Sequence, residues 1–451
     1  MKTKKTFSFV ILLLVFLLST SAQTIKKWSL EDCIGAAITN NLSVQRSLLN
    51  QELANSNYSG QKGTFLPTVN GFVGTTINFG RTIDPFTNTF ATDEVRSDSY
   101  GVRANWDLFN GMQRYNSYKQ NQMEVEASRY DAEKTKNDIS LAVTRSFLEI
   151  VFNKELLRVA EEQQVLTEQQ VKRTKQLVDA GSLPKGNLMD MQAQLAQDEL
   201  NAVTVGNNLK LSYLQLLILM RLDTLETFEI DIPEIKTENL SGLKTTPTFV
   251  YIKAVENLPE VQSAKLRLEA AQNGISMSKG RLSPTLGFNA SLGSGFSGKN
   301  IDIETGETKP FGQQVSDNFN QSIGFSLSIP IFNSLSTRTN IQQAKISKEL
   351  RQNEMDQVKY EINETVKRAY FDAQAARKAY LANEKAVYAR QESYNYSEKR
   401  YKVGVMNAIE FNQAKNSLVK SEADLLRAKY DYVFKTMILD FYQGIPLSLR
   451  P

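Results

Sequence analysis

The chain has 451 residues, with 53 lysine and arginine residues against 49 aspartate and glutamate residues, no histidine and one cysteine. The absence of histidine excludes Ser-His-Asp and Cys-His catalytic units and any histidine-ligated metal. A single cysteine excludes an intramolecular disulfide and cysteine-rich metal sites. The near-neutral formal charge of +4 argues against a dedicated nucleic-acid binder. We therefore expect no catalytic residues, no metal site and no cofactor.

The first 22 residues have the pattern of a secretory signal peptide. Three lysines among the first five residues precede an apolar stretch from Phe7 to Leu18, and the small residues Thr20 and Ala22 occupy cleavage-type positions. The alternative, an uncleaved membrane anchor, is disfavoured because a spanning helix needs about 20 apolar residues. No later segment reaches that length, so we expect an exported chain that does not enter a membrane as a helix.

The mature sequence contains an internal duplication. Gly181 recurs as Gly404 after 223 positions, within a block that aligns without a gap from Phe109 and Phe332 onward. An upstream block recurs after 217 positions. Each half is predicted to contain a helix, two strands, a very long helix, a turn and a returning helix. The predicted segments are the signal peptide at 1–22, a first repeat at 23–222, an equatorial linker at 223–247 and a second repeat at 248–451.

Four segments alternate between apolar and polar residues, the pattern of strands with two unlike faces. They lie at about 67–79, 99–109, 284–296 and 321–332. Each has the length of a tilted strand that crosses a bilayer. A soluble sandwich with one wet face is the alternative, but the polar faces are rich in Gly, Ser and Asn and no further strands are predicted. The residues assigned to lipid are Tyr100, Val102, Trp106, Leu108, Phe288, Leu292, Ile323, Phe325, Leu327 and Ile329.

Four strands are too few to close a membrane barrel, because the smallest have about 8 strands. An open sheet edge in lipid would leave backbone groups unpaired, at a cost of several kcal/mol each. The barrel must therefore be shared between chains. Two chains would give eight strands and three would give twelve, and strand counting leaves both possibilities open.

Two very long helices are predicted at 111–179 and 334–402, where proline is absent and glycine occurs only at Gly111. Each corresponds to about 100 Å of helix and ends at a glycine turn. Apolar residues form two stripes on the first long helix, which favours staves with neighbours on both sides over a two-stranded coiled coil with one seam. The shorter helices are predicted at about 29–62, 187–222, 248–280 and 407–442.

The order of these elements and several short motifs resemble the TolC family of outer-membrane factors. The first helix opens at Trp28-Ser29-Leu30-Glu31-Asp32, prolines 67 and 284 precede strands, and Tyr401-Lys402-Val403-Gly404 is followed by Glu410-Phe411-Asn412-Gln413-Ala414. The resemblance implies an α+β membrane protein of the outer membrane. Its homotrimer would form a twelve-stranded β-barrel, continued by a long α-helical barrel in the periplasm.

The same resemblance implies a passive exit duct of a tripartite efflux or type I secretion system. The implied partners are a periplasmic adaptor protein, an inner-membrane pump and outer-membrane lipid, with no nucleic acid. An exported coiled-coil scaffold without a conduit remains the alternative.

The resemblance also implies roles for residues beside the two glycine turns. Acidic residues after the second turn narrow the periplasmic entrance in the family; Glu410 matches the first such position, and Gln413 occupies the second without a charge. A solvated helix charge is the alternative role for Glu410. Tyr401 matches one member of a Tyr–Arg constraint whose arginine position holds a methionine. The other entrance residues are Asn187 and Asp190, and the implied adaptor-docking residues are Gly181, Ser182, Leu183, Gly404, Val405 and Met406.

Overall fold

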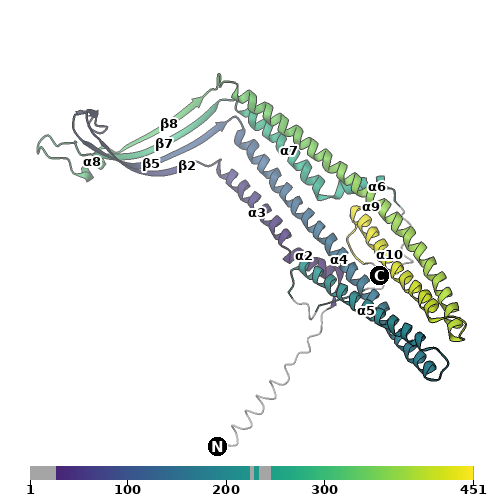
Figure 1. Cartoon of the computed structure of the whole chain (residues 1–451). Coiled ribbons are helices and arrows are strands. Elements are labelled where there is room, and N and C mark those ends of the chain that lie inside the picture. The colour runs from purple at the N-terminus through teal and green to yellow at the C-terminus, as the bar shows by residue number, and fades with distance from the viewer. Residues whose placement is uncertain (1–26, 224–227, 233–244, 450–451) are drawn as a thin grey trace, which may run out of the picture. The chain divides into compact units, whose positions relative to one another are not determined.

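A computed structural model describes residues 27–223, 228–232 and 245–449, and the predicted signal peptide lies outside them. The chain divides into two compact units (Figure 1). The sheet unit comprises residues 47–133 and 259–360, and the helical unit comprises the described residues 27–46, 134–223, 228–232, 245–258 and 361–449. Two long helices contribute residues to both units: α4 (Gln113–Asp179) and α9 (Ser336–Lys402).

The sheet unit is built on a four-stranded antiparallel sheet with the order β2-β5-β7-β8. Its strands are β2 (Thr68–Asn78), β5 (Val95–Asn110), β7 (Thr285–Ser297) and β8 (Asn320–Ser328). One helix precedes β2 and another precedes β7, whereas α4 follows β5 and α9 follows β8. All four helices therefore join the same end of the antiparallel sheet (Figure 1). The helices that lead in are α3 (Leu42–Gly63) and α7 (Pro259–Gly280).

The two connections at the opposite end of the sheet contain short elements that the sequence pattern did not predict. These are the hairpin of β3 (Thr82–Ile83) with β4 (Phe90–Ala91), and the helix α8 (Phe311–Asp317). Asp84 anchors the first connection, because its carboxylate accepts hydrogen bonds from the amides of Phe86 and Thr87 and from Ser297 at the end of β7.

Several boundaries differ from the predicted ones for reasons of backbone geometry. β8 ends at Ser328 because Pro330 lacks an N–H group with which to continue a ladder, so Ile329 lies outside the strand. β5 begins at Val95, four residues before the predicted start. The long helices begin at 113 and 336, because Met112 and Leu335 have φ values of 62° and 64° that a right-handed helix does not allow.

The helical unit contains the later parts of α4 and α9 with four further helices. These are α2 (Leu30–Asn40), α5 (Lys185–Met220), α6 (Pro247–Asn257) and α10 (Ala408–Tyr442). The helices predicted at 29–62 and 248–280 are each interrupted once, at Asn41 and Leu258, which have extended backbones. Within the predicted linker, β6 (Glu229–Ile230) pairs in parallel with β1 (Lys27–Trp28).

The core of the helical unit is an apolar cluster to which α2, α4, α5 and α10 contribute. Phe147 and Ile150 of α4 are fully buried, as are Leu216 and Met220 of α5. The cysteine, Cys33 of α2, is buried in the same cluster as a free thiol. Elements from both repeats therefore share one core, which packs α10 of the second hairpin against α4 and α5 of the first.

Candidate functional site

The two glycine turns have the same backbone structure. Gly181 and Gly404 adopt φ values of +71° and +78°, in the left-handed region that favours glycine. The amide of Ser182 donates to the carbonyl of Leu177, and the amide of Val405 donates to that of Arg400, at 2.8 and 3.0 Å. These six-residue hydrogen bonds end each long helix in a Schellman motif. The turns that the sequence predicts in the two repeats thus share one backbone conformation and one hydrogen-bond pattern.

The return helix of the second hairpin begins with a side-chain cap. The Asn407 side chain accepts a hydrogen bond from the amide of Glu410 at 2.8 Å, which satisfies a free N–H group of α10. Glu410 is exposed and lies in the first turn of α10, where the helix dipole favours a carboxylate. The first hairpin differs, because Pro184 precedes α5 and supplies no side-chain cap.

The predicted entrance and tip residues fall into two separate places in the helical unit. Asn187, Tyr401 and Glu410 line a cavity of about 790 Å³ between the two hairpin turns. The predicted tip residues that share this cavity are Ser182, Leu183, Gly404, Val405 and Met406. Asp190 and Gln413 instead line a second groove, of about 670 Å³, between α5 and α10. The structure therefore groups Glu410 with the turns and separates it from Gln413.

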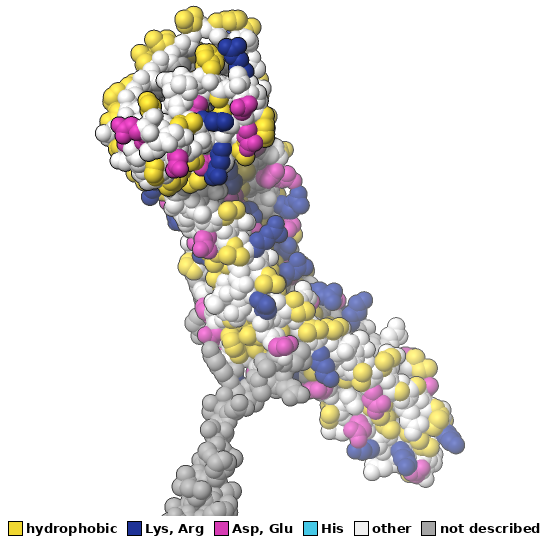
Figure 2. Space-filling model, turned by 90° about the vertical axis from the view of Figure 1, so that its left-hand side faces the viewer, with side chains coloured by type: hydrophobic (Ala, Val, Ile, Leu, Met, Phe, Trp, Pro, Cys, Tyr) yellow, Lys and Arg dark blue, Asp and Glu magenta, His cyan; other side chains and the backbone are white. Residues whose placement is uncertain are grey.

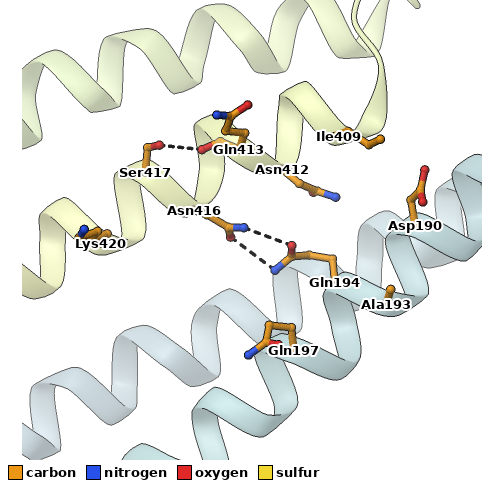
Figure 3. Close-up of a pocket in the computed structure, with 10 residues that line it drawn as sticks. All are labelled: Asp190, Ala193, Gln194, Gln197, Ile409, Asn412, Gln413, Asn416, Ser417 and Lys420. Atoms are coloured by element: carbon orange, nitrogen blue, oxygen red, sulfur yellow. Dashed lines mark hydrogen bonds between the residues drawn. The ribbon is translucent and has the colours of Figure 1, made fainter.

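Half of the ten residues that line the groove between α5 and α10 carry amide side chains (Figure 3). Gln194 and Asn416 exchange two hydrogen bonds across it, at 3.2 and 3.4 Å. Asn412 is buried beside them, and its Nδ2 lies 3.5 Å from the sulfur of Met191. These polar contacts hold the return helices of the two repeats together.

Tyr401 is held inside the chain by an aromatic cluster. Its ring stacks on that of Phe411 with the centroids 4.6 Å apart and the planes within 7°. The ring of Tyr394 also packs on Phe411, with the centroids 5.8 Å apart, and Phe411 is 1% exposed. The Tyr401 hydroxyl lies 3.5 Å from the hydroxyl of Thr174 on α4. Tyr401 thus joins α9, α10 and α4.

A buried ion pair beside this cluster was missed in the sequence. Lys415 of α10 is 2% exposed, and its Nζ lies 3.4 Å from Oδ2 of Asp198 on α5. The same Nζ donates to the hydroxyl of Thr167 on α4. The sequence did contain one signal of this pair. Ala408, Phe411 and Leu418 have the helical spacing of a buried face, and Lys415 falls on the same face.

The register of the sheet gathers its apolar residues on one face. Val102 lies opposite Leu292, Trp106 opposite Phe288, and Phe288 opposite Phe325. Leu327 and Ile323 share this face by the same register, and most of these side chains are at least partly exposed. Figure 2, which views the loop end of the sheet unit, shows hydrophobic side chains along its margin and charged side chains toward its middle.

Three residues assigned to lipid differ from that simple pattern. The register shifts between Asp107 and Phe109, so Phe109 rather than Leu108 lies opposite Leu286. A bulge of this kind inserts one residue and reverses the alternation beyond it. The ring of Tyr100 packs against that of Phe311 on α8, with the centroids 5.7 Å apart, and Tyr100 is only partly exposed. Ile329 follows the end of β8.

The part of the chain that the structure describes contains neither a candidate metal site nor a candidate membrane-spanning helix. No cluster of three or more His, Cys, Asp or Glu residues there could hold a metal ion. Among the same described residues, no helix combines the length and apolar character needed to cross a membrane.

The chain matches the family model described as outer membrane efflux protein over residues 33–220 and 250–439, which is most of each repeat. The chain belongs to the outer membrane efflux protein family. Its resemblance to the TolC family and its location in the outer membrane are thereby confirmed. The two matched segments lie within the residue ranges of the two predicted repeats.

Individual relatives extend over more than two thirds of the chain. The outer membrane efflux protein BepC of Brucella suis biovar 1 is 22% identical over 408 residues, covering 89% of this chain and 82% of BepC. The outer membrane protein TolC of Vibrio cholerae is 21% identical over 318 residues, or 69% of this chain and 68% of TolC. The solved structure of the channel-forming protein CusC superposes with a TM-score of 0.75 at 15% identity, covering 93% and 92% of the two chains.

Proposed function

We propose that the chain forms the passive outer-membrane exit duct of a tripartite efflux or type I secretion system. Three copies each contribute four strands to one twelve-stranded barrel, which a long helical barrel continues into the periplasm. An inner-membrane pump supplies the energy, a periplasmic adaptor protein joins the pump to the duct, and outer-membrane lipid surrounds the strands. Membership of the efflux family supports this role.

The open sheet is the observation that carries the proposal. Among the described strands, β2 pairs with β5 alone and β8 pairs with β7 alone, so each has one free edge. Unpaired backbone groups cost several kcal/mol each in hydrocarbon, and the apolar face of this sheet is suited to hydrocarbon. Placing β8 of one copy beside β2 of the next satisfies both edges, and repeating that contact around an axis closes the barrel.

An exposed apolar stripe on α5 supports contact with a second copy. Leu200 and Leu211 are eleven positions apart, as are Val203 and Leu214, and all four are exposed in the single chain. Eleven residues are close to three helical turns, so these four side chains lie on one side of α5. Val203 is 70% exposed, and large apolar side chains arranged in this way are typical of an interface.

Glu410 is proposed to narrow the periplasmic entrance. Three copies around one axis would form a ring of carboxylates that attracts cations and repels anions. Gln413 adds no second ring of charge, and it lines a different groove from Glu410. The hairpin turns, whose residues line the cavity beside Glu410, are the proposed docking surface for the adaptor.

Two measurements test this function. Outer-membrane fractions should contain heat-resistant trimers, and purified trimers should conduct ions in planar bilayers. Replacing Glu410 with alanine should raise single-channel conductance or weaken block by divalent cations, whereas replacing Asp431, an exposed residue near the other end of α10, should change neither. A monomeric soluble product without conductance would instead support the coiled-coil scaffold.

A further inference from the structure

Three helices of the helical unit meet at one buried charge. The ammonium group of Lys415 on α10 donates to the Thr167 hydroxyl on α4 and lies 3.4 Å from the Asp198 carboxylate on α5. The side chain of Lys415 is 2% exposed and that of Asp198 is 9% exposed. A charged group this deeply buried is tolerated only where partners replace the water that it has lost.

The carboxylate of Asp198 has its own complete set of partners. Its Oδ2 also contacts the Thr167 hydroxyl, and its Oδ1 accepts a hydrogen bond from Gln194 at 2.7 Å. Gln194 continues the chain of contacts to Asn416, which adjoins Lys415 on α10. Two consecutive residues of α10 are thus tied to two residues of α5 that lie one turn apart, and α4 is tied to both helices.

The surroundings make any other position of Lys415 costly. Burial lowers the pKa of its ammonium group, and the carboxylate of Asp198 offsets only part of that change. The other charged residues that share a cavity of about 540 Å³ with Lys415 are Arg158, Glu162 and Glu422. Sliding α10 by one helical turn, about 5.4 Å, would withdraw the ammonium group from Asp198 and Thr167 together.

The contacts nearer the turns are of a more adaptable kind. Between Lys415 and Gly404, α10 is held by the stacking of Phe411 on Tyr401 and by the contact of Asn412 with Met191. The aromatic contact is less tied to one axial position than an ion pair, since dispersion and burial have little directional preference. The hydrogen bond from Asn412 is weak, because a thioether sulfur is a weak acceptor. Lys415 lies seven residues after Ala408, the first residue of α10, or about 10 Å along the helix.

We propose that Lys415, Asp198 and Thr167 form a register lock that fixes the axial position of α10 against α4 and α5. When the duct opens, the hairpin turns move while the helices at the lock keep their positions relative to one another. A single polar residue at a core position of packed helices selects one register at some cost in stability. The lock divides α10 into a mobile segment that carries Glu410 and a fixed segment beyond Lys415. It rests on the proposed function, because the movement that it limits is the opening of a duct.

A matched ion pair on the same helix provides the control. Lys435 of α10 lies 3.1 Å from Asp372 of α9, but these side chains are 27% and 47% exposed. Water can replace either partner there, so the pair contributes little to register. The double variants Lys415→Met/Asp198→Asn and Lys435→Met/Asp372→Asn each remove one pair and leave no buried charge without a partner.

The experiment measures hydrogen exchange and conductance on purified trimers of the full chain. In Lys415→Met/Asp198→Asn, amides of residues 408–418 should exchange at least tenfold faster, and channel openings should become more frequent. The control double variant should match the wild type in both measurements. The single variant Lys415→Met should melt below the double variant, because it leaves the buried Asp198 carboxylate without a positively charged partner.

Unchanged exchange and unchanged gating in Lys415→Met/Asp198→Asn would overturn the lock, as would equal effects in the control pair. A wild-type trimer that never conducts would overturn the proposed function instead. The exchange comparison does not depend on conduction, so it still decides whether the buried pair holds the register.

Discussion

An arginine placed on the apolar face of the sheet tests which face meets lipid. Val102 lies at the middle of β5, opposite Gly71 on β2 and Leu292 on β7, and is 45% exposed. In the proposed barrel, Val102→Arg places a guanidinium group near the bilayer midplane, which costs about 2–4 kcal/mol per chain. Three copies in one trimer raise the cost to roughly 6–12 kcal/mol, enough to prevent stable assembly.

The chain offers a control three residues away. Asn105 lies on the other face of β5, opposite Asn289, and that face already carries Arg103. Asn105→Arg should therefore assemble like the wild type. Heat resistance of trimers on gels and urea unfolding of trimers refolded into vesicles measure the difference. If Val102→Arg were tolerated as well as Asn105→Arg, the apolar face would not be the lipid face and the barrel orientation would be wrong.

Three further predictions concern stability. Gly404→Ala should destabilise the trimer by about 1–2 kcal/mol per chain in chemical denaturation, because nothing lies within 4 Å of the added Cβ and the whole cost comes from the φ of +78°; a neutral result would contradict the left-handed turn. Phe147→Ala should cost about 3–5 kcal/mol, since the side chain is fully buried in the helical core, and a loss below about 1 kcal/mol would contradict that packing. Burial, with a smaller contribution from Glu162, raises the pKa of Glu422, so the native state favours its protonated form and loses stability as pH rises through that raised pKa. Glu422→Gln should therefore melt above the wild type at pH 8 and approach it toward pH 4 in thermal scans; an equal gap at both pH values would exclude this cause.

Local pattern was a good guide to the elements and a poorer guide to their ends. Alternation of apolar and polar residues depends on the two-residue period of a strand, and it located all four strands of the sheet. It did not predict the shift between Asp107 and Phe109, because a bulge is set by pairing with a neighbouring strand. The break at Asn41 carried no proline or glycine signal, so the predicted helix ran through it. The break at Leu258 did carry one, because Pro259 follows and favours an extended residue before it, but the predicted helix ran through this position as well.

The candidate site was predicted in part. The glycines of the two turns were recognisable because a left-handed residue after a long helix is a local requirement. The separation of Glu410 from Gln413 was not, since it depends on where α5 lies beside α10. The stacking of Tyr401 on Phe411 and the burial of Lys415 likewise required contacts between distant segments.

What the sequence determined by itself was the duplicated order of elements, the two faces of the strands and the glycine turns. Each of these follows from backbone periods and from residues whose conformational limits act within a few positions. Only the tertiary structure decided which charges are buried and what they meet. Lys415 and Thr167 are 248 positions apart, and the free energy of a buried ion depends on partners that folding alone brings to it.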